Sequence, residues 1–208
     1  TKEACGTGHC GACSVLIDGK LARSCVTPLR TLAGKRVETI ENAAKDGALS
    51  VIQRSFLDAG AVQCGFCTPG MVMATKALLL RTLSPTEGEI YDGLRHNYCR
   101  CTGYVKIIEA VKLAAARLRG EDVSLADVRT REKSVIVAGK DQVVPEIKGN
   151  YVGRSVWDVD GPAKVTGALK FCDDFEAEEF GAAEMLHGAF VWAPAPHGRL
   201  RSADYSAV

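Results

Sequence analysis

The sequence predicts an α+β chain in which a short β-rich part precedes a helical part. The first forty residues hold brief apolar runs on both sides of an Asp-Gly turn, a pattern typical of a β-hairpin. From about residue 47, apolar residues recur at steps of three and four, as they do along one face of a helix. The composition changes again near residue 150. We therefore expect four segments, at residues 1–42, 43–120, 121–150 and 151–208.

The β-rich segment is expected to contain three strands. Ser14-Val-Leu-Ile17 and Lys20-Leu-Ala-Arg23 flank Asp18-Gly19, which favours a type I′ hairpin turn. A third strand is predicted at residues 36–40. Three strands make a thin sheet, so we expect that further strands of this unit precede residue 1.

Four helices are expected in residues 43–120, and their start and stop signals place them at about 47–59, 69–83, 85–94 and 102–119. Thr68 and Pro69 are typical of an N-cap and the first residue of a helix. Ser84-Pro-Thr-Glu87 matches a capping box. The second helix carries apolar residues on most of its sides, which predicts that it is buried.

A first group of four cysteines lies in and just after a glycine-rich loop. Its spacing is C-x4-C-x2-C with a fourth cysteine after the hairpin, which is the plant-type 2Fe–2S spacing. Glycines in the loop permit positive φ angles and a close approach to a cluster, and the hairpin returns the fourth cysteine to the other three. His9 is expected outside the ligand set. The predicted ligands are Cys5, Cys10, Cys13 and Cys25.

A second group of four cysteines is arranged as C-x2-C and C-x-C. We expect each pair at the N-terminus of a helix, where free N–H groups stabilise anionic thiolates. The alternatives are zinc, which also takes four thiolates, and the disulfides of a secreted domain; the spacing favours iron–sulfur. Cys172 is expected to be an inert, partly buried thiol. The predicted ligands are Cys64, Cys67, Cys99 and Cys101.

Charge and hydropathy exclude other classes of function. The 208 residues carry a formal net charge of +1, which offers no argument for binding nucleic acid or an anionic membrane. No apolar run approaches the ~18 residues of a membrane span. The two groups of cysteines therefore indicate a two-cluster electron conduit joined to the start of a further domain, since neither site offers an open coordination position.

Three motifs in order resemble the iron–sulfur region of the molybdenum hydroxylases, the xanthine dehydrogenase/aldehyde oxidoreductase family. They are the stretches Cys5–Cys13, Val62–Met71 and Tyr98–Tyr104. The later part of the chain resembles the opening of that family's molybdenum-binding domain, through Gly153–Val156, Asp160, Lys164–Gly167, Asp173-Asp174 and Ala193–His197.

The resemblance implies a fold for each segment. Residues 1–42 would be a plant-ferredoxin-like β-grasp remnant without its N-terminal strands, and residues 43–120 a four-helix 2Fe–2S bundle. Residues 121–150 would be a linker, and residues 151–208 the truncated start of an α/β molybdopterin-binding domain. Direct fusion without a flavin domain is closest to the aldehyde oxidoreductases that lack one.

The resemblance also implies an oxidoreductase reaction. Aldehydes, or N-heterocycles such as purines, would be hydroxylated with water as the oxygen source. Electrons would pass from molybdenum held by molybdopterin through the second 2Fe–2S cluster, then the first, to an external acceptor. Gln63 and Cys101 lie where the family contacts the pterin. The family's catalytic glutamate would lie beyond Val208, so we assign no catalytic residue here.

The implied partners are the remainder of the molybdenum domain, the small-molecule substrate and the acceptor. That acceptor would be a ferredoxin- or flavodoxin-like protein or a separate flavin subunit, and the resemblance allows a homodimer. We expect no nucleic acid, no membrane span and a cytoplasmic location. The competing hypothesis is a stand-alone two-cluster electron carrier without its own catalytic centre.

Overall fold

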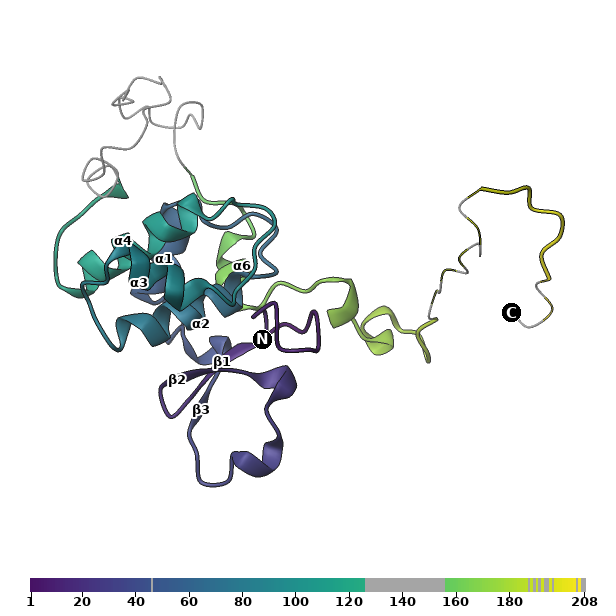
Figure 1. The fold of residues 1–208 in the computed structure, drawn as a ribbon, viewed down its shortest axis with the longest axis horizontal. Coiled ribbons are helices and arrows are strands. Elements are labelled where there is room, and N and C mark those ends of the chain that lie inside the picture. Colours follow the sequence, from purple (N-terminus) through teal and green to yellow (C-terminus); the bar gives the residue numbers. More distant parts are fainter. Residues whose placement is uncertain are drawn as a thin grey trace, which may run out of the picture. The chain divides into compact units, whose positions relative to one another are not determined.

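The computed structural model describes residues 1–45, 47–125 and 156–186, and then residues 188, 190, 192, 195, 197–204 and 206. The chain divides into two compact units, Thr1–Leu169 and Lys170–Val208 (Figure 1). The first unit contains both a sheet and helices, in agreement with the predicted α+β class. Residues 126–150 of the predicted linker lie outside the described residues.

The sheet has three antiparallel strands in the order β2-β1-β3. β1 spans Ser14–Ile17, β2 spans Lys20–Arg23 and β3 spans Val37–Glu38. Asp18 and Gly19 both have positive φ angles, 49° and 78°, as the predicted type I′ turn requires. β3 is shorter than the strand expected at 36–40, because the chain turns at Ile40 to bury that side chain in the core.

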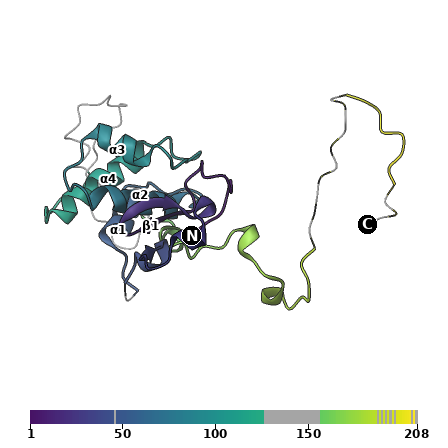
Figure 2. The same cartoon turned by 60° about the horizontal axis from the view of Figure 1, so that its bottom comes forward.

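The four predicted helices are all present, and a further short helix follows. α1 spans Val51–Asp58, α2 Thr68–Leu79, α3 Glu87–Leu94, α4 Val105–Leu118 and α6 Gly161–Thr166. α2 lies between the sheet and the other helices, and contacts β1, α1, α3 and α6 (Figures 1 and 2). Ten of its twelve residues are buried, which confirms the prediction made from its apolar sides.

The boundary signals of two helices were predicted wrongly. α3 is capped by Thr86, whose backbone N–H and hydroxyl both lie 2.8 Å from Glu89 Oε2, and not by Ser84. This second capping box begins two residues after the expected one. α2 has Cys67 at its N-cap position, with Thr68 and Pro69 inside the helix, and it ends at Leu79 rather than near residue 83.

α6 lies in the segment expected to begin a molybdenum-binding domain, yet it packs against α1 and α2 within the first unit. Val165 is fully buried there. The described residues of the second unit, taken by themselves, form two short 3-10 turns, at Cys172–Asp174 and Ala177–Phe180. Among the described residues, no helix is long and apolar enough to cross a membrane.

Candidate metal centres

The first cysteine loop runs from Cys5 to Cys13 and leads directly into β1. Its glycines at 6, 8 and 11 have φ angles of 62°, 77° and 73°, so the expected left-handed turns are present. Cys13 is buried, Cys10 and Cys25 are half-buried, and Cys5 is exposed. The hairpin carries the chain back, and the N–H of Ser24 donates to the Cys13 carbonyl at 3.2 Å.

The surroundings of Cys5 and Cys25 change the pKa values of their thiols in opposite directions. The Thr7 side chain and the backbone N–H groups of Cys10, Thr7 and His9 bond to Cys5 and lower the pKa of its thiol to about 5. The N–H groups of Thr7 and Cys10 lie 3.4 and 3.5 Å from its Sγ. Burial, and then the neighbouring thiol of Cys13, raise the pKa of Cys25. The hydrogen bonds therefore favour a thiolate at Cys5.

Cys64, Cys67, Cys99 and Cys101, which we call the second quartet, lie close together although they come from two loops far apart in the sequence. The first quartet is Cys5, Cys10, Cys13 and Cys25. Cys64 Sγ and Cys101 Sγ lie 3.6 Å apart, and the thiols of Cys67 and Cys99 are hydrogen-bonded. Burial and the nearby thiol of Cys99 raise the pKa of Cys67. Burial also opposes ionisation of Cys99, but several hydrogen bonds together outweigh it and lower that pKa. They come from the Thr102 hydroxyl, at 3.3 Å, from the backbone of Thr102 and Cys101, and from the Cys67 thiol.

Only one of the two cysteine pairs lies at a helix N-terminus. Cys67 is the N-cap residue of α2 in place of the predicted Thr68, so the Cys64–Cys67 pair does lie at a helix N-terminus, as expected. Cys99 and Cys101 precede α4 by several residues, so the helix predicted from residue 102 was placed too early. The intervening turn is held by Tyr104, which has a φ of 70° and whose hydroxyl oxygen accepts from the Cys99 N–H at 2.9 Å. This role of Tyr104 was missed in the sequence.

The two cysteine loops are in direct contact with each other. The N–H of Tyr98 donates to the carbonyl of Cys10 at 2.9 Å. The buried Asn97 amide donates to the Gly11 carbonyl at 3.0 Å and lies 3.2 Å from Ser14 Oγ. Sequence reasoning missed this junction. Its one signal was the position of Asn97 and Tyr98 immediately before Cys99.

The arrangement of the thiols in the second quartet fits a 2Fe–2S cluster. Within the described ranges, no group of three or more His, Cys, Asp or Glu side chains surrounds a single metal-ion position. In the second quartet the sulfurs are in contact as two pairs, Cys64 with Cys101 and Cys67 with Cys99. A 2Fe–2S cluster takes its four thiolates as two on each iron. Burial, and after it the neighbouring thiols, raise the pKa of Cys25 and Cys67, and bound cations would offset this cost of forming the thiolates.

The remaining predicted site residues lie at the surface. Gln63 is exposed beside the exposed Cys64. Cys101, the other residue expected to contact the pterin, is exposed as well. Cys172 is also exposed, so the expectation of a partly buried thiol was wrong.

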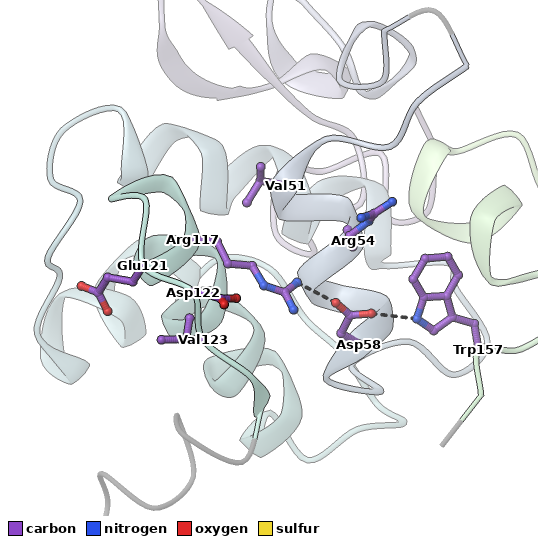
Figure 3. A pocket seen from close by; sticks show the side chains of 8 residues that line it. All are labelled: Val51, Arg54, Asp58, Arg117, Glu121, Asp122, Val123 and Trp157. Atoms are coloured by element: carbon purple, nitrogen blue, oxygen red, sulfur yellow. Dashed lines mark hydrogen bonds and ion pairs between the residues drawn. The ribbon is translucent and has the colours of Figure 1, made fainter. Parts of the chain in front are cut away.

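A cavity of about 600 Å³ lies beside α1 and the C-terminal end of α4 and contains no cysteine (Figure 3). Arg117 and Trp157 point toward Asp58 from opposite sides and bond to its two carboxylate oxygens at 2.6 and 2.9 Å. The hydrogen bond from Trp157 therefore attaches residues 156–169 to α1. The cavity is lined by Val51, Arg54, Asp58, Arg117, Glu121, Asp122, Val123 and Trp157.

The chain is similar to known iron–sulfur proteins. Residues 39–112 match the family model of the [2Fe-2S] binding domain. A probable xanthine dehydrogenase subunit of Bacillus subtilis is 48% identical over 121 residues, which is 58% of this chain and 67% of that protein. An aldehyde oxidoreductase of Megalodesulfovibrio gigas is 34% identical over 213 residues, which covers 99% of this chain but 21% of that protein.

A solved structure of an aldehyde oxidoreductase is similar to this chain in fold as well as in sequence. The aldehyde oxidoreductase from Desulfovibrio desulfuricans superposes with a TM-score of 0.69 at 36% identity. The match covers 83% of this chain and 18% of the larger protein. The chain thus spans about a fifth of the aldehyde oxidoreductases that it matches.

Proposed function

The chain belongs to the xanthine dehydrogenase/aldehyde oxidoreductase family of molybdenum hydroxylases, and on that basis we propose that it relays electrons through two 2Fe–2S clusters. The [2Fe-2S] binding domain match and the named relatives establish an iron–sulfur, electron-transferring part of an oxidoreductase. The number of clusters, their ligands and the reaction they serve are our proposals.

We assign one cluster to each cysteine quartet. The first would be held by Cys5, Cys10, Cys13 and Cys25, and the second by Cys64, Cys67, Cys99 and Cys101. When bound, each cluster accepts and releases one electron at a time. The N–H groups around Cys5 and the Thr102 hydroxyl on Cys99 would stabilise negative charge on the sulfurs. Such hydrogen bonds are one means by which a protein sets a cluster's reduction potential.

The observation that carries the proposal is the hydrogen bond between Tyr98 and Cys10. Cys10 belongs to the first quartet, and Tyr98 directly precedes Cys99 of the second. A short covalent path with one hydrogen bond of 2.9 Å therefore connects a ligand of each proposed cluster. Such contact between the two cysteine loops supports electron transfer between the clusters.

We further propose that the electrons come from a molybdenum centre outside these residues. Oxidation of an aldehyde to a carboxylic acid with water releases two electrons and two protons. These electrons would enter at the second quartet, where the exposed Gln63 and Cys101 are available to a pterin. They would leave from the first to a ferredoxin- or flavodoxin-like acceptor or a flavin subunit. N-heterocycles such as purines are the alternative substrates.

A separate electron-carrying subunit is the second candidate, because the Bacillus subtilis relative is itself named as a subunit. The aldehyde oxidoreductase alignment favours the single-chain arrangement, since it extends over 99% of the chain. In both cases we propose a cytoplasmic location, because the reducing cytosol keeps cysteine thiols free of disulfides and available as ligands.

Reduction of the intact enzyme by substrate tests this proposal. The enzyme that contains this chain is mixed anaerobically with a panel of aldehydes and N-heterocycles, and visible absorbance of the clusters is followed by stopped flow. We expect bleaching with at least one compound class and complete bleaching with dithionite. Bleaching by dithionite alone would favour the separate carrier, and an absence of visible absorbance would contradict both candidates.

A further inference from the structure

Residues 156–169, which we call the α6 segment, are attached to the helical part of the chain at several points. Trp157 bonds to Asp58 of α1. The side-chain amide of Gln53, itself fully buried, donates to the Val165 carbonyl at 3.1 Å. Gly161 is so close to Leu57 that an added Cβ would lie 3.0 Å from its Cδ2. The α6 segment is therefore a packed part of this unit.

Within this segment, Lys164 covers the loop that carries Cys64 and Cys67. Gly65 in that loop has a φ of +89°, and a Cβ built there would lie 2.5 Å from Lys164 Cγ and 2.8 Å from its Cβ. The aliphatic part of Lys164 thus rests directly on the backbone of Gly65. The Lys164 side chain is only 10% exposed, which is unusual for a lysine.

Two carboxylates hold the ammonium group of Lys164. Its Nζ lies 2.7 Å from Asp160 Oδ1 and 3.4 Å from Asp158 Oδ2. Both acidic side chains are about half exposed, so the charged end of the lysine is directed toward solvent while its aliphatic part stays against the loop. The ion pairs therefore engage only the ammonium end of Lys164, and the contact with Gly65 is made by its aliphatic part.

We propose that Lys164 is a positioning residue for the second cysteine loop, whose aliphatic stem holds the Cys64–Cys67 backbone in place and shields it from water. Solvent exposure and backbone geometry both influence an iron–sulfur cluster, so the α6 segment links the later part of the chain to the second cluster. The effect on the cluster rests on the proposed function. The effect on the loop does not.

Hydrogen–deuterium exchange of a peptide spanning about residues 60–68 tests the effect on the loop. Lys164→Ala removes the stem, whereas Lys164→Met keeps most of it and removes the charge. We expect exchange in this peptide to become about tenfold faster in Lys164→Ala, equivalent to about 1.4 kcal/mol, and to stay near wild type in Lys164→Met. Lys112→Ala, which removes another paired lysine of the helical part, is the control and should leave the peptide unchanged.

Three results would overturn the proposal. They are unchanged exchange in Lys164→Ala, equal acceleration in the Met and Ala variants, and equal acceleration throughout the chain. The second would assign the effect to the charge, and the third to a general loss of stability.

Iron release to a chelator then tests the effect on the cluster. In Lys164→Ala we expect the EPR signal of the second cluster to decay faster, while that of the first cluster decays as in wild type. Equal decay of both signals would contradict the assignment. A wild-type chain without iron would refute the proposed function, and the exchange result would still decide the role of Lys164.

Discussion

The backbone N–H of Tyr98 donates to the carbonyl of Cys10 at 2.9 Å, so the two cysteine loops are joined through their main chains. Apart from proline at position 98, which lacks the donating N–H, no substitution removes this hydrogen bond directly. Its geometry depends instead on how closely the backbone of the first cysteine loop can approach the backbone of α2. Gly11 and Gly70 permit that approach, because a Cβ on Gly70 would collide with the Gly11 carbonyl.

Gly70→Ala should therefore disturb the junction between the two loops. The added methyl group has no space beside Gly11, so we expect a loss of about 1–3 kcal/mol in the free energy of unfolding. Gly88→Ala is the matched control, since Gly88 is an exposed helical residue with nothing within 4 Å of an added Cβ. It should be neutral or stabilise the chain by about 0.4–1 kcal/mol. Urea denaturation measures both, and equal stabilities would contradict the described contact.

Asn97→Ala tests the side-chain part of the same junction. The substitution leaves the Gly11 carbonyl without its buried donor and opens a small space at a position that is 2% exposed. We expect a destabilisation of about 1–3 kcal/mol. Asn42→Ala, at an exposed position, should change stability by less than about 0.5 kcal/mol. If the two variants unfold at the same urea concentration, Asn97 does not hold the loops together.

Cys13→Ser should remove the first cluster and spare the second. Cys13 is a proposed ligand of the first quartet alone, and it is buried where a serine cannot replace a thiolate ligand. EPR of the reduced protein should then show one signal instead of two. Cys172→Ser provides the control, because this exposed thiol belongs to neither quartet and its removal should leave both signals. Loss of both signals in Cys13→Ser would contradict independent sites.

Cys101→Ser should disturb the second cluster and interrupt electron flow in the intact enzyme. Its Sγ lies 3.6 Å from Cys64 Sγ, and the residue is also one of the two proposed pterin contacts. We expect substrate to reduce the first cluster much more slowly, while dithionite still reduces it. Stopped-flow absorbance with each reductant separates the two effects. Unchanged turnover with substrate would contradict the proposed route.

Glu89 should give the start of α3 a pH-dependent stability. Hydrogen bonds from the Thr86 backbone and side chain lower the pKa of this carboxylate in the folded state. A lowered pKa contributes stability above the unfolded value of about 4.3, and that contribution is lost as the pH falls through the folded value. The stability difference between wild type and Glu89→Ala should therefore shrink below about pH 4. A difference that stays constant from pH 7 to pH 3 would show that the charge has no role.

Features specified by neighbouring residues could be predicted from the sequence. Asp18-Gly19 specifies the hairpin through its own backbone preferences, and this prediction is confirmed. The positive φ angles of the first cysteine loop follow in the same way from its glycines. The start of α3 could not be chosen locally, because Ser84 and Thr86 each begin a plausible capping box.

Features specified by distant residues could not be predicted. Asn97 lies just before Cys99, but this position does not indicate that its side chain is buried against the first cysteine loop. Lys164 is polar, and nothing adjacent to it in the sequence indicates that it is buried against a cysteine loop. Their partners, Gly11 and Gly65, are 86 and 99 positions away. The turn from Cys99 to Tyr104 likewise depends on a hydrogen bond from the Cys99 N–H to the Tyr104 hydroxyl. Because of this turn, α4 begins at Val105 and not at residue 102.

The most direct test of a two-cluster electron relay is spin quantitation by EPR on the dithionite-reduced chain, with iron measured in the same sample. Each reduced 2Fe–2S cluster has one unpaired electron, so the account predicts two distinct signals, about two spins and about four irons per chain. A chain that holds zinc, has no visible absorbance and gives no EPR signal on reduction would contradict it.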